Sequence, residues 1–180
     1  MTRNKSHATA LQWNWKSRQE LNRRLLDSYG DLAAPRRAFV MDAMRRDPYR
    51  TPRAELATLG ALTDDTDENC DVCFTYLVSV TPLLAVRLSM VGPYALVQAL
   101  DDGTSTASRP RVITSEEELD SPAARDVLRI LARHGLRCLS EPMLAEPVGL
   151  HLPDVAEPTV YNALFAPEDQ PWVIAEGSGR

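Results

Sequence analysis

The sequence feature that most constrains the fold is a change of hydrophobic pattern at Cys70. Before this residue, apolar side chains recur at spacings of three and four, which is typical of one face of a helix. After it, β-branched and aromatic residues dominate and turn signals recur about every ten residues, which is typical of strands. Grouped helices followed by grouped strands predict an α+β fold and argue against the alternating order of a doubly wound nucleotide-binding sheet.

Residues 1–69 are predicted to be mainly helical, after a short strand near the start. Trp13 and Trp15 alternate with polar residues, so both indoles are expected on one strand face and, because Trp is usually buried, in the core. Their basic neighbours allow the alternative that they stack on the bases of a single-stranded nucleic acid. The first helix is expected to begin directly afterwards, at the capping-box pair Ser17 and Glu20.

Glycine and proline positions delimit the predicted helices. Gly30 is expected to end the first helix in a left-handed conformation. The second helix is predicted over residues 35–46, because Pro48 disfavours helical geometry in the residue before it. The third helix is predicted to begin at Thr51-Pro52 and to carry the apolar residues at positions 56, 59 and 62.

An antiparallel meander is predicted to follow, with a C-terminal helix packed on one face of the sheet. The predicted strands are residues 72–80, 84–91, 94–100 and 111–114. Ser115 and Glu118 have the spacing of another capping box. The main helix is expected over residues 122–134, and a further strand over residues 136–139.

Length and composition fit one domain over residues 1–180, with a sheet-containing section at residues 70–172 and a frayed tail at residues 173–180. The first 15 residues contain no continuous apolar stretch, so a secretory signal is not expected. Three cysteines without such a signal predict reduced thiols rather than disulfides. We therefore expect a cytoplasmic protein without a membrane-spanning segment.

Charge is distributed unevenly along the chain. Residues 1–50 carry 11 basic and five acidic side chains, a net charge of +6, whereas the remaining 130 residues carry a net charge of −11. The total of −5 disfavours binding of the chain as a whole to nucleic acid or to an anionic membrane. This asymmetry is compatible with a two-faced surface or with halves that attract one another within the fold.

A short acidic segment, residues 64–71, is the strongest candidate binding site. Its five carboxylates are those of Asp64, Asp65, Asp67, Glu68 and Asp71. The segment opens like a calcium loop, but Cys70 stands where that loop needs glycine and Tyr76 where it needs glutamate, so an EF-hand is excluded. A solvated loop is one interpretation, and a docking surface for a basic protein is the other, since charge blocks commonly serve interactions.

Four residues have types and spacings that suit a zinc site. They are Cys70, Cys73, His134 and Cys138. The two pairs are about 60 residues apart in the chain, and nothing local requires them to meet. Because free cysteine is among the most buried residue types, buried thiols are the favoured interpretation, and no metal or cofactor is predicted.

No sequence motif indicates catalysis. Phosphate-binding glycine loops, nucleophile elbows and zinc-protease helices are all absent, and His151 with Asp154 is a weak acid–base pairing. We therefore expect a non-enzymatic cytoplasmic protein-binding domain, in its sharpest version a bacterial immunity or antitoxin-like inhibitor. The alternative is a small-molecule enzyme or ligand-binding domain, with a pocket between helices and sheet and His151 or Tyr161 as its polar groups.

Overall fold

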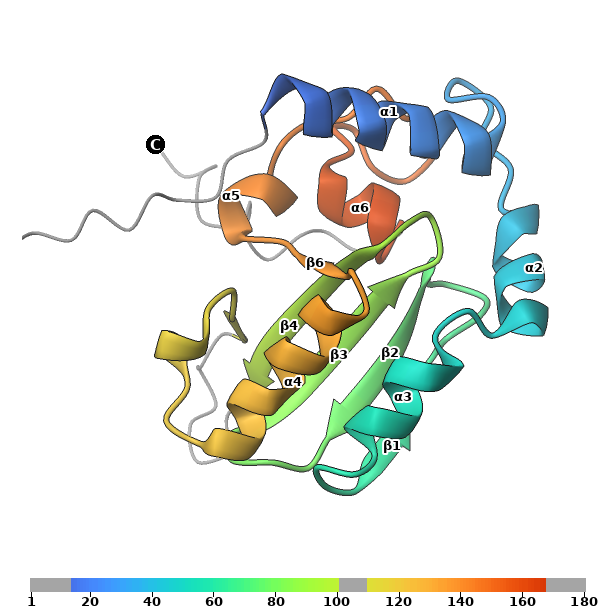
Figure 1. Ribbon diagram of the computed structural model, residues 1–180. Coiled ribbons are helices and arrows are strands. Elements are labelled where there is room, and N and C mark those ends of the chain that lie inside the picture. The colour runs from blue at the N-terminus through green and yellow to red at the C-terminus, as the bar shows by residue number, and fades with distance from the viewer. Residues whose placement is uncertain (1–13, 101–109, 168–180) are drawn as a thin grey trace, which may run out of the picture.

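A sheet with helices on both faces forms the centre of the computed structural model, which describes residues 14–100 and 110–167 (Figure 1). Within these ranges the six helices are α1 (Trp15–Tyr29), α2 (Ala38–Arg46), α3 (Arg50–Leu56), α4 (Pro122–Arg133), α5 (Glu141–Leu144) and α6 (Val160–Leu164). The six strands in the same ranges are β1 (Leu62–Asp64), β2 (Cys73–Val78), β3 (Leu83–Ser89), β4 (Tyr94–Leu100), β5 (Arg111–Val112) and β6 (Arg137–Cys138). The expected tail at residues 173–180 lies outside the described residues.

The sheet confirms the predicted α+β class. Strands β1 to β5 follow one another as an antiparallel meander, and β6 pairs in parallel with the start of β4. The outer edge of β4 is therefore shared, because Gln98 and Ala99 pair with β5 while Tyr94 and Ala95 pair with β6. The parallel pairing makes the sheet mixed, a feature that the sequence pattern did not indicate.

The beginning of α1 differs from its prediction. Lys16 and Trp15 belong to the helix, so the predicted strand does not extend over them, and Trp13 and the side chain of Trp15 lie outside what the structure describes. The cap is Asn14, whose side chain accepts a hydrogen bond of 2.9 Å from the Ser17 amide, rather than the predicted Ser17 and Glu20 box. Gly30 ends the helix at φ 76°, as predicted.

The predicted third helix ends early, and a strand follows it. Helix α2 stops at Asp47 as predicted, but α3 begins at Arg50 and ends at Leu56. Leu62, expected on that helix, lies in β1. The reason is a close backbone contact: a Cβ on Gly60 would lie 2.3 Å from the carbonyl oxygen of Ser79, so only glycine lets this turn place the next residues beside β2.

The two faces of the sheet pack against different helices. One face contributes Phe74, Tyr76, Val78, Leu84, Val86, Leu88, Ala95, Val97 and Ala99 to a core shared with α3 and α4. The opposite face contributes Cys73, Tyr94, Leu96 and Val112 to a second core shared with α1, α5, α6 and the segment that joins the last two. The main helix predicted after the meander is α4, and it packs on one sheet face, as predicted. Helices α1, α5 and α6 gather above one end of the sheet (Figure 1).

Local signals delimit α4 correctly. The Ser121 side chain accepts from the Ala124 amide, Pro122 occupies the first turn, and Gly135 follows the helix at φ 70°. The predicted capping box between Ser115 and Glu118 is present on the short 3₁₀ turn Glu116–Glu118. No helix among the described residues is long and apolar enough to cross a membrane.

Candidate functional site

The acidic segment, residues 64–71, begins with Asp64, the last residue of β1, and continues as the connection to β2, and its own side chains fold it. Asp67 accepts hydrogen bonds at Oδ1 from the amides of Asn69 at 3.0 Å and Cys70 at 3.3 Å, and Asp64 accepts from the Thr66 amide at 3.1 Å. Such side-chain turns satisfy backbone donors that a connection would otherwise leave to water. The conformation of the loop is therefore encoded in the carboxylates themselves.

A second chain segment holds the acidic segment from the side. The guanidinium of Arg37, the residue directly before α2, donates to the carbonyl oxygens of Asn69 and, at 3.3 Å, of Cys70. Charged hydrogen bonds of this kind are stronger than neutral ones. They join the residue before α2 to the backbone of the acidic segment.

The carboxylates of the segment point to solvent. Asp64, Asp65, Asp67 and Glu68 are exposed, and Asp71 is half-buried. Hydrogen bonds from the backbone of Asn69 and from Cys70 lower the pKa of Asp67, so this carboxyl is charged at neutral pH. Within the described residues, the side chains of Asp65 and Glu68 form no ion pair. The structure thus brings all five predicted residues together on one loop, next to β1, which is the last strand at this side of the sheet.

The four residues of the zinc interpretation do not meet. Cys73 is buried in the core under α1 and α6, whereas Cys138 packs against the core on the other sheet face. His134 lies 2.9 Å from Oε1 of Glu55, and Cys70 is exposed. Burial raises the pKa of both Cys73 and Cys138 to about 12, so these thiols are inert rather than reactive. Among the described residues, no group of three His, Cys, Asp or Glu could hold a metal ion.

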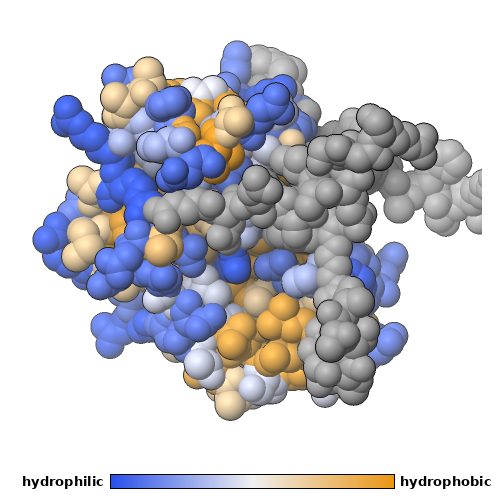
Figure 2. Space-filling model, turned by 180° about the vertical axis from the view of Figure 1, so that it is seen from behind, coloured by the Kyte–Doolittle hydropathy of each residue, from blue (hydrophilic) through white to orange (hydrophobic). Residues whose placement is uncertain are grey.

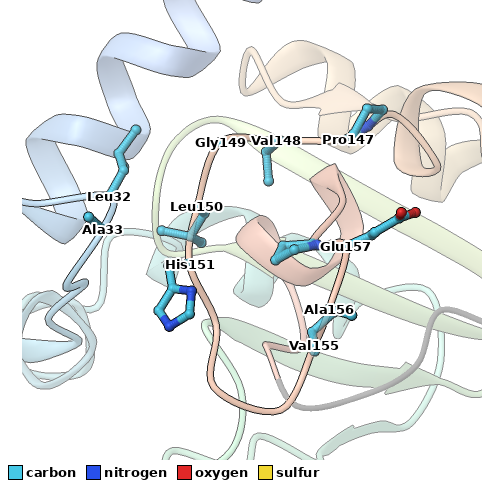
Figure 3. Close-up of a pocket in the computed structure, with 11 residues that line it drawn as sticks. Leu32, Ala33, Pro147, Val148, Gly149, Leu150, His151, Val155, Ala156 and Glu157 are labelled. Carbon is cyan, nitrogen blue, oxygen red and sulfur yellow. The ribbon is translucent and has the colours of Figure 1, made fainter.

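A cavity of about 820 Å³ lies between the segment after α1 and the segment that joins α5 to α6 (Figure 3). Leu32 and Ala33 line one side, and residues 147–151 and 155–158 line the other. Among the described residues that line it, His151 and Glu157 are the titratable ones. The His151 amide donates to the Leu32 carbonyl at 2.7 Å, which joins the two walls.

The predicted polar groups of a pocket are separated by the fold. His151 lines the 820 Å³ cavity, but Tyr161 is almost fully buried and accepts a 3.0 Å hydrogen bond from Arg87 of β3. His151 and Asp154 are both exposed, and no hydrogen bond joins them in the part of the chain that is described. The geometry therefore offers a mainly apolar cavity without an assembled acid–base pair.

Sequence reasoning missed Arg87. This residue stands alone among apolar neighbours in the strand Leu83–Ser89, and a charge inside an otherwise apolar strand was the available signal. Its contact with Tyr161 joins residues 74 positions apart, which no local pattern indicates.

Comparison of the chain with models of protein families, with curated proteins and with solved structures finds no match.

Proposed function

We propose that this protein is a non-enzymatic, cytoplasmic protein-binding domain whose acidic segment docks a basic partner protein. The sharpest version is a bacterial immunity or antitoxin-like inhibitor, which needs charge complementarity to its target and no catalytic groups. The observation that carries the proposal is the state of the carboxylates: four are exposed on a loop whose shape their own hydrogen bonds and Arg37 fix.

Preorganisation is what separates this loop from an ordinary solvated one. Binding costs conformational entropy whenever a loop must be ordered in the complex. Here the turns at Asp64 and Asp67 and the two bonds from Arg37 already order it. Asp65 and Glu68 are left with their charges uncompensated within the described part of the chain, so a partner's lysines or arginines can approach them without breaking an existing ion pair.

The test neutralises the charges without unfolding the loop. In the triple variant D65N/D67N/E68Q, the amide that replaces the Asp67 carboxylate keeps an oxygen that accepts the turn hydrogen bonds, so the loop conformation is retained. The matched control E117Q/D120N/D154N removes three equally exposed carboxylates elsewhere on the molecule. Immobilised wild-type protein first isolates the partner from an extract of the source cells, and stopped-flow mixing then measures association.

We expect the triple variant to associate about tenfold more slowly at low salt, because complementary fields act chiefly on the association rate. The deficit should shrink near 0.5 M salt, where the screening length falls to about 4 Å. The control variant should associate as the wild type does. A partner without basic character, or equal association rates for the triple variant and the wild type, would contradict the proposal.

The 820 Å³ cavity supports a second candidate function, the binding of a small apolar molecule. Its lining is mainly apolar apart from His151 and Glu157. The fluorescent dye 1-anilinonaphthalene-8-sulfonate serves as the probe. Replacing Ala33 by Trp fills the cavity and should abolish saturable dye binding, whereas Trp in place of Ala54, an exposed residue of α3, should not. Equal dye binding by both variants would remove this candidate.

A further inference from the structure

The sheet face opposite α3 and α4 carries a cluster of polar side chains on three neighbouring strands. Thr75 of β2 pairs directly with Arg87 of β3, and Ala85, two residues before Arg87, pairs with Gln98 of β4. Side chains alternate along a strand, so Thr75, Arg87 and Gln98 share this face. Diagonal neighbours in a sheet lie about 7–8 Å apart, within reach of long side chains.

Arg87 is a partly buried cation that forms no ion pair with a carboxylate of the described residues. Its Nη1 donates to the hydroxyl of Tyr161 at 3.0 Å, and its Nε is buried with no hydrogen-bond acceptor in the same part of the chain. The charge of Asp71 also acts on Arg87 and favours its charged form. Buried guanidinium groups are normally paired, since an unpaired one loses the solvation of its charge without compensation.

Gln98 adds a second polar group beside Arg87. The residue is 5% exposed, and no hydrogen bond to its side chain occurs among the described residues. The amide can donate from its nitrogen and accept at its oxygen. Among the described residues, Nε of Arg87 is therefore the buried donor without an acceptor on this face, and Gln98 is its diagonal neighbour on β4.

An apolar shelf continues from these donors along the strands. Leu77, Ala85, Leu83 and Leu100 lie on the same face, as the registers Leu77↔Ala85 and Leu83↔Leu100 show. The three leucines are half-buried, so part of their surface stays open. In the view from behind, Figure 2 shows a hydrophobic patch on the lower part of the molecule with hydrophilic side chains above it. The distance along β3 from Arg87 to Leu83 is about 13 Å.

We propose that Arg87 and Gln98 bind the carboxylate of an amphipathic monocarboxylic acid, whose apolar body lies on the shelf of Leu77, Ala85, Leu83 and Leu100. A planar guanidinium matches a carboxylate in geometry, and the single positive charge matches a single negative one, whereas a phosphate dianion would remain partly uncompensated. Tyr161 is a positioning residue, because its hydroxyl orients the Arg87 guanidinium. Burial of the apolar body on the leucines supplies the remaining affinity.

Isothermal titration calorimetry of the full chain with sodium decanoate, below its micelle concentration, tests the proposal. Decanoate should bind at one saturable site, and decyltrimethylammonium, of equal length and opposite charge, should not. R87Q should raise the Kd at least tenfold, and Q98L about threefold or more. R50Q is the matched control, since the Arg50 side chain is exposed and has no partner among the described residues, and its Kd should equal that of the wild type.

Three results would overturn the proposal. The first is the absence of saturable decanoate binding by the full chain. Binding that appears only after removal of residues 168–180 also counts as this result, because the chain itself would then occupy the shelf. The second is equal affinity of R87Q and R50Q for decanoate. The third is equal binding of decanoate and decyltrimethylammonium. Circular dichroism establishes that R87Q is folded; should it not fold, Q98L and the ligand pair decide the outcome alone.

Discussion

Under α3 and α4, the sheet presents apolar and aromatic side chains from β2, β3 and β4, whereas its opposite face mixes leucines with Thr75, Arg87 and Gln98. The covering layers differ in the same sense. Helix α4 has 12 residues and a strongly amphipathic sequence. The other face is covered by the 15-residue α1 together with the four-residue α5, the five-residue α6 and irregular segments. The more uniformly apolar face therefore packs against regular helices, whereas the mixed face packs also against short and irregular segments.

We expect the face under α3 and α4 to contribute mainly to stability and the opposite face to be the one that can bind a ligand. The interface under α3 and α4 is mainly apolar, but the Tyr76 hydroxyl is buried there without a hydrogen-bond partner among the described residues. The opposite face holds the buried Nε of Arg87, half-buried leucines and, beside it, the 820 Å³ cavity. A charged group buried without partners costs more free energy than a neutral hydroxyl, so we expect a ligand-binding role on the face that carries Arg87.

The largest expected effect contrasts two consecutive leucines of β3. Leu84 points to the α3–α4 face and is fully buried, and Leu83 points to the other face and is half-buried. Leu84→Ala should lower the free energy of unfolding by about 2–5 kcal/mol through lost burial and a cavity. Leu83→Ala should lower it by no more than about 1 kcal/mol. Urea denaturation measures both, and equal losses would show that the two faces do not differ in packing.

A smaller effect is expected where α1 meets α6. Tyr29 is fully buried and donates a 2.8 Å hydrogen bond to the Ala163 carbonyl. Tyr29→Phe should cost about 1–2 kcal/mol, because a buried carbonyl loses its partner and water cannot replace it. Tyr49→Phe is the matched control on the other side: its hydroxyl donates to Ser89 and Gly92 but is only partly buried, so water can compensate.

Thermal or urea unfolding of the two tyrosine variants measures this difference. A larger loss for Tyr29→Phe than for Tyr49→Phe would show that the α1–α6 interface depends on its buried polar contact. The reverse order would mean that the side of the molecule under α1 and α6 tolerates the loss of a tyrosine hydroxyl better than the side under α3 and α4, contrary to the expected contrast between the two faces.

Elements with local signals were predicted well from the sequence. Strand β4 has the predicted bounds, Tyr94–Leu100, because its apolar run ends at turn residues on both sides. The left-handed glycines at positions 30 and 135 and the capping box at Glu118 were also predicted, since each depends on a few adjacent residues. The exposed position of the acidic segment follows equally directly from its charge.

Elements that depend on distant partners were missed. Strand β1 has only three residues and exists because β2 lies beside it, so its sequence alone resembles the end of a helix or a loop. Helix α5 was not predicted, although Pro142 stands in its first turn, where proline is tolerated. The cluster at Arg87 likewise combines three strands and α6, and no periodicity in one segment reveals such a combination.

The smallest expected effect concerns the capping box of the 3₁₀ turn Glu116–Glu118, which precedes α4, and it depends on pH. Partial burial opposes the charge of Glu118, but Oε1 accepts hydrogen bonds from the Thr114 amide at 3.0 Å, the Thr114 hydroxyl at 3.1 Å and the Ser115 amide at 2.9 Å. The net result is a pKa of Glu118 below its ordinary value. Glu118→Gln keeps an oxygen that accepts these hydrogen bonds but loses the charge that strengthens them, so it should cost about 0.5–1 kcal/mol at pH 7.

The sign of the pH dependence follows from the lowered pKa. A carboxyl with a lower pKa in the folded state stabilises the fold above its unfolded pKa, and this contribution disappears as the pH falls through the folded value. The difference between wild type and Glu118→Gln in urea denaturation should thus be full at pH 7 and shrink steadily below about pH 4. Glu117→Gln, exposed and outside the box, should differ from wild type by less than about 0.5 kcal/mol at either pH. A difference for Glu118→Gln that persists unchanged at low pH would show that packing, not the charge of Glu118, stabilises the 3₁₀ turn before α4. The correct prediction of this capping box from its sequence spacing would then not reflect the interaction that holds the turn in place.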